Sequence, residues 1–198
     1  MGDCNTNNIL KLLFSYMPKI AEERKMDGLL ILMADLGRSL VGADRCSLWL
    51  VDEQKSELWT KVAHGVAELR IPSNLGFVGY TLNSGESLCI KDAYEDSRFD
   101  SRSDLKTNYH TKSVLTVPLK NSEGRIIGVF QAINKKEPPY YFSSQDIEYL
   151  SLTAVYSEKT IESALLTKEL EETQAEILYM LGEVSEHRSK ETADHVMR

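Results

Sequence analysis

The stretch Ser113–Lys135, SVLTVPLKNSEGRIIGVFQAINK, decides the fold because it reads as two strands joined by a tight turn. Apolar and β-branched residues alternate along both arms with a period of two, as expected in a sheet. Asn121–Gly124 supplies the turn, with a glycine ready for a positive φ. Both faces of the second arm are largely apolar, which predicts a central strand covered by helices.

Gln131 is the polar exception on the second arm of this hairpin. A polar side chain on a covered strand needs a hydrogen-bond partner. Either Gln131 bonds neighbouring backbone, or it points into a ligand cavity. The strand pattern leaves both interpretations open.

The composition is that of an ordinary globular protein, with 198 residues, 42% hydrophobic content and a net charge of −7. One domain with extensions fits this length, and the acidic balance argues against a nucleic-acid surface. The sequence has neither an apolar run of ~18 residues nor the order of a secretory signal, so we expect a cytoplasmic protein. Three scattered cysteines fit a reduced compartment and argue against a cysteine-based zinc site, with Cys46 and Cys89 expected in the core.

The segment ahead of the hairpin predicts two helices and a first pair of strands. Helices are expected at Ile9–Ile20, ended or bent near Pro18, and at Glu22–Val41. Asp44–Asp52 and Leu58–Ala63 then alternate as strands and should form a hairpin.

The middle of the chain predicts a short helix and a long polar connection. The helix should lie between an N-cap at Asn74 and a stop at Gly85, with a short strand at Leu88–Ile90 after it. Free N–H groups at this helix start could receive an anion, although its glycines could equally serve close packing. Asp92–Thr111 is polar and long enough to be a binding segment with one or two short helices.

The C-terminal part predicts one long helix. Ser143 or Ser144 can cap a helix that begins near Gln145. Heptad spacing recurs farther along it, at Leu166, Leu170, Thr173, Ile177, Met180 and Val184. This spacing predicts a parallel helix pair and hence a homodimer. The competing interpretation is a single, acidic, solvated helix on a monomer.

The order of these motifs resembles a GAF domain over residues 24–160. The resemblance rests on RCSLWLVD, the G-x-x-G helix, D-A-Y-x-D-x-R-F, S-V-L-x-V-P-L and an I-G-V strand that ends in N-K. It is strongest to the GAF domains that regulate cyclic-nucleotide phosphodiesterases and some bacterial adenylyl cyclases. The motif of that subgroup is N-K, a spacer, F, three residues and D-E, and here it reads Asn134, Lys135, Phe142 and Asp146, with Ile147 at the last place.

The resemblance implies an α+β fold, with a six-stranded antiparallel sheet flanked by helices and a long C-terminal connector helix. A purine cyclic monophosphate would be enclosed between the sheet and Asp92–Thr111. Lys135 and Asp146 would form an ion bridge that closes this region, as a structural lock shared with Asn134 and Phe142. The alternative is a solvated lysine and an aspartate at a helix start.

The resemblance also implies a set of ligand-binding positions. They are Ser47, Ala63, His64, Phe77, Val78, Asp100, Thr107, Thr111 and Gln131. Ser47 would meet the base, the backbone N–H groups of Phe77 and Val78 would face the cyclic phosphate, and Thr107 and Thr111, one helical turn apart, would offer hydroxyls. Relatives carry other residue types at Ala63, His64, Asp100 and Gln131, which leaves the choice between cyclic AMP and cyclic GMP open.

Residues 186–198 resemble the opening helix of an HD-GYP phosphohydrolase domain, through EHRSKETADHV. That family hydrolyses cyclic di-GMP at a cluster of two or three metals. Glu191 and His195 lie four residues apart and could share a metal in a full-length protein. Since the rest of such a domain is not in this sequence, we expect no metal site and no enzymatic activity in the fragment.

These observations predict an N-terminal helical extension (1–23), a GAF domain (24–160), a connector helix (161–185) and the start of an HD-GYP domain (186–198). The expected function is a sensor that binds cyclic AMP or cyclic GMP and controls a downstream cyclic di-GMP phosphodiesterase through a dimeric connector. No cofactor, nucleic acid or membrane is expected as a partner. The alternatives are a dimerisation module without a ligand and an independent enzyme, which the absence of a nucleophile–base arrangement or a P-loop disfavours.

Overall fold

The computed structural model describes residues 2–60 and 68–196, without the side chains of residues 2–8, 103, 106, 168 and 183–196. Its elements are α1 (Gly2–Glu22), α2 (Met26–Leu40), β1 (Ala43–Asp52), β2 (Glu57–Thr60), β3 (Leu69–Pro72), α3 (Gly76–Ser84), β4 (Leu88–Ile90), the 3₁₀ turn η1 (Ala93–Glu95), α4 (Arg102–Thr107), β5 (Val114–Lys120), β6 (Ile126–Lys135) and α5 (Ser144–Val196). The residues 61–63 of the second predicted strand lie outside the described ranges.

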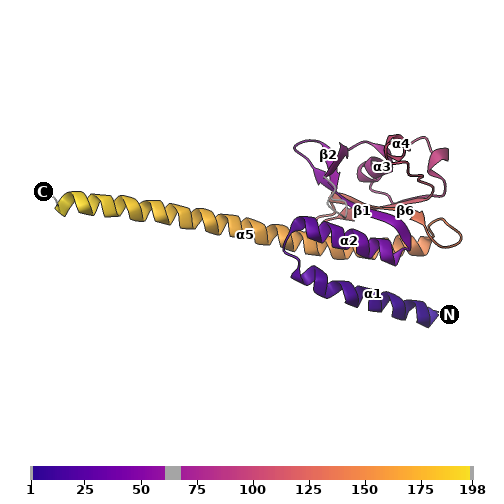
Figure 1. The fold of residues 1–198 in the computed structure, drawn as a ribbon, viewed down its shortest axis with the longest axis horizontal. Coiled ribbons are helices and arrows are strands. Elements are labelled where there is room, and N and C mark those ends of the chain that lie inside the picture. The colour runs from indigo at the N-terminus through magenta and orange to yellow at the C-terminus, as the bar shows by residue number, and fades with distance from the viewer. Residues whose placement is uncertain (1, 61–67, 197–198) are drawn as a thin grey trace. The chain divides into compact units, whose positions relative to one another are not determined.

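The strands of the described chain form one six-stranded sheet in the order β3-β2-β1-β6-β5-β4 (Figure 1). All neighbouring strands are antiparallel. The predicted central hairpin is present as β5 and β6, and Gly124 in its turn has a φ of 81°. The α+β architecture predicted from the sequence is therefore confirmed.

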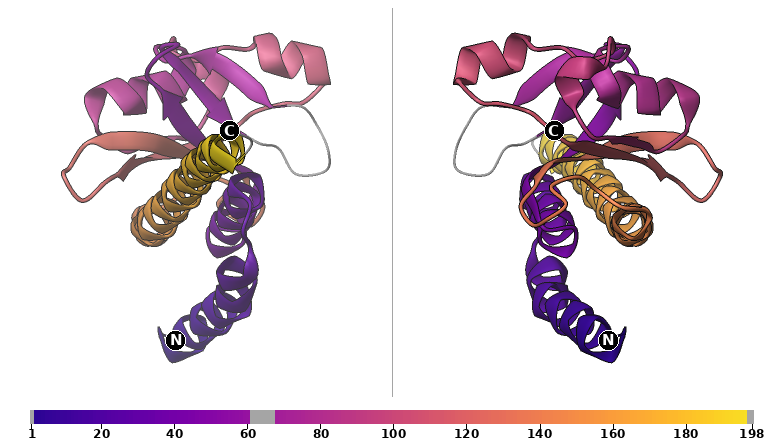
Figure 2. Two further views of the ribbon diagram at one scale, coloured as in Figure 1. Left: turned by 90° about the vertical axis from the view of Figure 1, so that its left-hand side faces the viewer. Right: turned by 90° about the vertical axis from the view of Figure 1, so that its right-hand side faces the viewer.

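Helices cover both faces of this sheet. On one face, Gly37 of α2 lies beside Leu150 of α5 and the ring of Phe130 on β6. On the other face, the hydroxyls of Thr81 on α3 and Thr116 on β5 are 2.6 Å apart. Figures 1 and 2 show α2 and the first turns of α5 on one side of the sheet, with α3 on the other. The central strand is covered on both sides, as its apolar faces require.

The first helices differ from the prediction in their bounds. Pro18 lies inside α1, which continues to Glu22, and α2 begins only at Met26. Tyr16 and Ile20 are both buried, and the Tyr16 hydroxyl donates to Asp35 of α2 at 2.5 Å. Packing on both sides of Pro18 thus compensates for the backbone hydrogen bond that proline cannot donate.

Two further predictions were wrong in detail. The N-cap of α3 is Leu75, without a side-chain bond, and not Asn74, because Gly76 starts the helix from a left-handed φ of 64°. Gly85 ends α3 in the left-handed conformation, as predicted. Cys89 is exposed rather than in the core, because it lies on the short edge strand β4, and Cys46 is half-buried.

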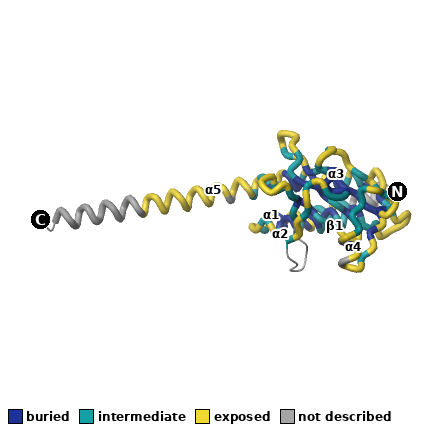
Figure 3. Tube along the Cα trace, turned by 90° about the horizontal axis from the view of Figure 1, so that it is seen from above, coloured by how far each residue is buried: buried dark blue, intermediate teal, exposed yellow. Residues whose placement is uncertain are grey.

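Helix α5 runs from Ser144 to Val196, and the contacts of the chain divide into one unit of residues 1–161 and another of residues 162–198. In the second unit, most of the described residues are exposed as far as residue 182 (Figure 3), and they include large apolar ones. The large apolar ones are Leu165, Leu166, Leu170, Ile177, Leu178, Tyr179, Met180 and Leu181. Within the described residues, none of the helices has the length and apolar character needed to cross a membrane.

Gly128 tests how closely β6 and β1 pack. A methyl group added at this glycine would overlap the carbonyl oxygen of Trp49 on β1. We expect Gly128→Ala to lower the free energy of unfolding by about 3 kcal/mol or more, because a backbone atom cannot move aside as a side chain can. Gly182→Ala is the control, since nothing lies within 4 Å of its added carbon. Chemical denaturation measures both, and equal stabilities would contradict the packing.

Candidate functional site

A row of polar side chains crosses the centre of the sheet on the face covered by α3. Gln131 of β6 pairs with Ser47 of β1 on one side and with Thr116 of β5 on the other. Directly opposed residues of antiparallel strands share a face. Thr116 is buried against Thr81, whereas Ser47 and Gln131 are only half-buried in the middle of the sheet. Ser47 and Gln131, both predicted from the sequence, therefore lie side by side with access from the α3 side.

The Gln131 side chain has a defined orientation. The indole nitrogen of Trp49 donates to the Gln131 side-chain oxygen at 3.2 Å. Because the indole N–H can only donate, the amide oxygen must face Trp49. The amide NH₂ group of Gln131 is then left to donate elsewhere. In the described part of the chain, Gln131 thus bonds the side chain of Trp49, and its two N–H groups are available as donors.

The segment Asp92–Thr111, hereafter the lid, packs on α3 through aromatic rings. Phe99 stacks on Phe77 of α3 with 5.8 Å between ring centroids, and Tyr94 meets Phe99 edge-on at 4.9 Å. The ring of His110 stacks on Tyr94 at 4.8 Å. The side chain of Phe77 is therefore part of an apolar cluster with Ala93 and Val114, and the ligand role of its backbone N–H stays a prediction.

A buried carboxylate, Asp104, forms hydrogen bonds that connect different parts of the lid with each other. It accepts hydrogen bonds from the backbone N–H of Thr111 at 2.6 Å, from the Thr111 hydroxyl at 2.8 Å and from the Tyr94 hydroxyl at 3.2 Å. Helix α4 ends at Thr107, and Asn108 is left-handed with a φ of 50°. The prediction that Thr107 and Thr111 lie one helical turn apart was wrong, because the helix stops between them.

Asn134, the first residue of the N-K motif, holds the end of the lid to the sheet. Its side-chain oxygen accepts from the Lys112 N–H at 2.7 Å, and its amide donates to the His110 carbonyl at 2.8 Å and to the Tyr109 hydroxyl at 3.0 Å. Its backbone N–H also donates to the Ser113 carbonyl at 2.8 Å. The left-handed backbone of Asn134, with a φ of 57°, is the conformation that brings these groups together.

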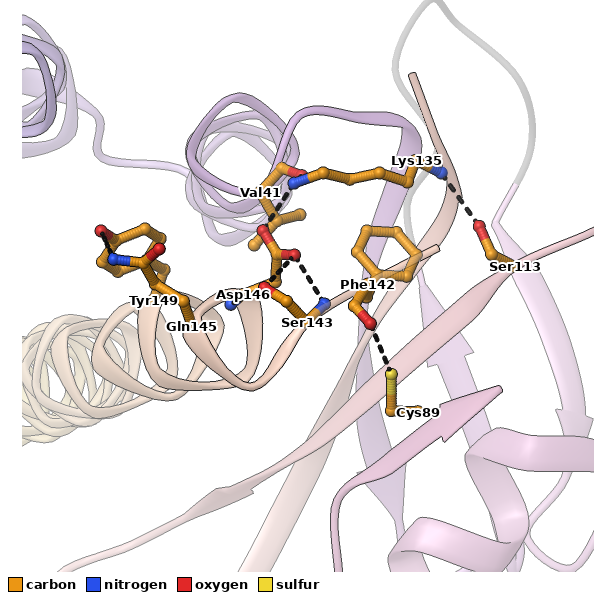
Figure 4. Close-up of polar contacts among 9 residues, drawn as sticks. All are labelled: Val41, Cys89, Ser113, Lys135, Phe142, Ser143, Gln145, Asp146 and Tyr149. Carbon is orange, nitrogen blue, oxygen red and sulfur yellow. Dashed lines mark hydrogen bonds and ion pairs between the residues drawn. The ribbon is translucent and has the colours of Figure 1, made fainter. Parts of the chain in front are cut away.

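Lys135, the next residue, contacts the helices instead of the lid (Figure 4). Its ammonium group lies 2.6 Å from Asp146 of α5 and donates to the Val41 carbonyl, after α2, at 2.8 Å. The second Asp146 oxygen accepts from both the N–H and the hydroxyl of Ser143 at 2.8 Å. Phe142 is buried beside this group. The ion pair predicted between Lys135 and Asp146 is present, with side chains only 16% and 7% exposed, so neither is solvated.

Tyr109 is a site residue that the sequence reasoning missed. Its hydroxyl donates to Asp44 at 2.8 Å, and the guanidinium of Arg45 lies 3.5 Å from its ring centroid. Burial and the Asp44 carboxylate raise the pKa of Tyr109 to about 12. A tyrosine at the end of a polar loop carries no periodic signal, which is why the sequence pattern did not indicate it.

The other residues predicted to bind a ligand or a metal do not join the row of Ser47 and Gln131 in the described structure. Val78 is buried in a cluster with Trp49, Leu58 and Val129, and Asp100 pairs with Arg102 at 2.8 Å. Ala63, His64 and the side chains of Glu191 and His195 lie outside the described part of the chain. Among the side chains that are described, no three His, Cys, Asp or Glu residues lie close enough together to hold a metal ion.

Comparison with known proteins gives one family. The model of the GAF domain matches residues 26–160. The chain is 32% identical over 185 residues to the probable 3′,5′-cyclic phosphodiesterase pde-5 of Caenorhabditis elegans, covering 86% of this chain and 25% of that protein. It is 37% identical over 140 residues to the dual 3′,5′-cyclic-AMP and -GMP phosphodiesterase 11A of Takifugu rubripes, covering 64% of this chain and 16% of that protein. The chain thus spans a quarter or less of these relatives.

Solved structures of low identity share the fold. The GAF domain of a phosphoenolpyruvate-protein phosphotransferase from Coxiella burnetii matches with a TM-score of 0.69 at 18% identity, over 82% of this chain and 97% of that one. A free methionine-R-sulfoxide reductase from Neisseria meningitidis matches with a TM-score of 0.66 at 24% identity, over 84% of this chain and 95% of that one. One structure is a domain of a larger protein and the other an enzyme, so they inform on the fold alone.

The Lys135–Asp146 pair can be tested by a double-mutant cycle. We expect Lys135→Ala to lower the free energy of unfolding by about 3 kcal/mol, because it leaves the Asp146 carboxylate buried without its cation. Asp146→Ala should cost at least as much, since it also removes the acceptor of Ser143. The two losses should not add in the double variant. Lys136→Ala, which removes an exposed neighbour, is the control; fully additive losses would argue against the pair.

Proposed function

Since the chain belongs to the GAF domain family, we propose that it is the regulatory sensor of a signalling protein and binds cyclic AMP or cyclic GMP between its sheet and its lid. The observation that carries this proposal is the position of Asn134 beside Lys135. Asn134 holds the lid, and Lys135 holds the first turn of α5. A change in the lid would therefore reach α5 through the peptide bond between Asn134 and Lys135 and through the ion pair of Lys135 with Asp146.

The residues around the polar row suit a cyclic nucleotide. The Gln131 amide offers donors to a purine edge, and the Ser47 hydroxyl beside it can donate or accept. The start of α3, with the backbone N–H groups of Phe77 and Val78, suits an anionic phosphate. Both chemistries lie on the same face of the sheet as the lid. This combination supports a purine phosphate over an apolar ligand.

The coupling between ligand binding and the helices would arise because the ligand binds one arrangement of the lid more tightly than the other. A ligand shifts an equilibrium only as far as it binds one state better than the other. Closure over the nucleotide would change the strain on Asn134, and Lys135 would pass the change to Asp146 and to the carbonyl of Val41. Two helices, α2 and α5, thus respond to the same residue.

The controlled domain would follow α5. The resemblance of residues 186–198 to an HD-GYP opening helix supports a cyclic di-GMP phosphodiesterase, with Glu191 and His195 among its metal ligands. The names of the animal relatives favour a 3′,5′-cyclic phosphodiesterase as the alternative. In both cases the fragment itself is a regulator and not an enzyme.

Thiol chemistry is an unfavourable use of the described cysteines. Burial raises the pKa of the Cys46 thiol to about 12, and burial also raises the pKa of Cys89. A nucleophilic cysteine needs a depressed pKa, because the thiolate is the reactive form. The raised thiol pKa values therefore favour a binding role over thiol catalysis. The functional alternative to ligand binding is a dimerisation module that takes no ligand.

Dimerisation through α5 is supported by the positions of its heptad residues. The heptad positions at Leu166 and Leu170, extended backwards along α5, fall on the polar Ser163 and Lys159 and then on Tyr156, Leu152 and Tyr149. In the first unit the last three of these residues line a groove of about 320 Å³ together with apolar residues of α1 and α2. They are Ile9, Leu13, Met17, Ile20, Leu36 and Leu40. A second copy would cover this groove in the first unit, and the heptad positions beyond residue 161 are a separate pairing surface.

Ligand binding is tested by calorimetric titration with cyclic AMP, cyclic GMP and cyclic di-GMP. We expect a cyclic monophosphate to bind, and Gln131→Leu to weaken binding by about 1 kcal/mol or more, because it removes the oriented donor. Gln54→Leu, in the exposed turn before β2, is the matched control. No heat with any nucleotide, from folded protein, would favour the dimerisation module.

The hydroxyls of Thr107 and Thr111 are tested by variants that distinguish contact with the ligand from the hydrogen bond of Thr111 to Asp104. Thr107→Ala with Thr111→Ala should weaken nucleotide binding by about 1 kcal/mol per lost hydrogen bond. Thr111→Ala also removes a bond to Asp104, whereas Thr111→Ser keeps a hydroxyl there. If the double alanine variant titrates like the parent protein, these residues do not contact the ligand.

Dimerisation is tested by sedimentation at micromolar concentration. We expect a dimer, with Leu170→Asp raising its dissociation constant at least tenfold, since burying one leucine side chain is worth about 1.5–3 kcal/mol. Leu165→Asp changes an exposed leucine off the heptad phase and should have a smaller effect. A monomer with and without nucleotide would exclude the dimeric connector but leave the ligand site untouched.

A further inference from the structure

We propose that Tyr109 is a positioning residue that latches the lid to the sheet and sets how fast the lid opens over the Ser47–Gln131 row. The effect on ligand exchange rests on the proposed function, whereas the effect on lid opening does not. The proposal arises from three contacts of one side chain with two different strands.

The first part of the evidence is the reach of Tyr109. Its hydroxyl donates to Asp44 at the start of β1 and accepts from the amide of Asn134 near the end of β6. Its ring lies against the guanidinium of Arg45, 3.5 Å from the centroid. A single lid side chain thus bridges the two strands that carry Ser47 and Gln131.

The second part is that the lid is fastened internally by other residues. Asp104 binds Thr111 and Tyr94, and the Ala93 N–H donates to the Lys112 carbonyl at 2.7 Å, which closes the base of the segment. The lid can therefore keep its own structure when it moves. Among the described contacts, Tyr109 and the neighbouring groups that Asn134 holds join the lid to β1 and β6.

The third part is the location of the Tyr109 contacts. Arg45 and Ser47 are two residues apart on β1, so both project from the same face of the sheet. The Tyr109 ring on Arg45 therefore closes one end of the face on which Gln131 presents its amide. Asp44 and Arg45 are exposed, so water can replace their contacts when the latch opens.

Loss of the latch has a distinctive kinetic consequence. The hydroxyl contacts join Tyr109 to Asp44 and Asn134 rather than to the Ser47–Gln131 row, so we expect them in the closed lid with or without a ligand beneath it. Their removal should therefore speed opening in both states, so that association and dissociation rise together and the dissociation constant changes little. A residue that merely supports the folded site would raise dissociation without speeding association.

The first experiment needs no ligand. We expect Tyr109→Phe, which keeps the ring on Arg45 but removes both hydrogen bonds of the hydroxyl, to speed exchange of the Lys112 amide, which donates to Asn134 across the lid and the sheet, at least tenfold. Tyr140→Phe, at an exposed tyrosine outside the lid, should leave exchange unchanged. Asp44→Asn keeps an acceptor for the hydroxyl and should give a smaller rise than Asp44→Ala. Unchanged exchange in Tyr109→Phe would overturn the proposal.

The second experiment uses stopped-flow binding of fluorescent cyclic AMP and cyclic GMP derivatives. We expect Tyr109→Phe to raise both rate constants by a similar factor, roughly tenfold. A rise in dissociation alone would overturn the latch and leave a structural role. If neither nucleotide binds the parent protein while exchange still rises in Tyr109→Phe, the proposed function fails and the latch stands.

Discussion

The ion pair between Lys135 and Asp146 is the interaction on which most of the arrangement depends. It joins the end of the central strand β6 to the start of α5, and the same ammonium group holds the carbonyl that follows α2. Both helices that cover one face of the sheet are thereby fixed to the strand that carries Gln131. Because the pair is largely buried, loss of either partner would leave an uncompensated charge at a large cost in free energy. The adjacent Asn134 extends this control to the opposite face.

The sequence predicted the sheet well because its signals are local and periodic. Alternation in Ser113–Lys135 and the turn at Gly124 determined the central hairpin. The long polar Asp92–Thr111 segment was identified as a connection with short helices, as η1 and α4 show. Gln131 was singled out by one polar residue on an apolar strand. These features need only neighbours in sequence or one strand partner.

The predictions that failed depended on tertiary contacts. Pro18 did not end α1, because Tyr16 and Ile20 anchor the helix on both sides. Cys89 was expected in the core, but its strand turned out to be the edge of the sheet. Tyr109 was not found at all, since its partners Asp44 and Asn134 lie 65 and 25 residues away. Such contacts have no signature in a single sequence.

The alignment of Ser47 with Gln131 depends on Gly128, a residue that has no side chain. Gly128 lets the backbone of β6 approach the carbonyl of Trp49, and it lies three residues before Gln131 on the same strand. A slip of one residue between β1 and β6 would turn Gln131 toward α2 and α5 and bring Phe130 to the face covered by α3. The close approach allows only one alignment of the two strands. The polar row therefore depends on this one alignment, because Ser47, Gln131 and Thr116 lie side by side only while β6 keeps its register.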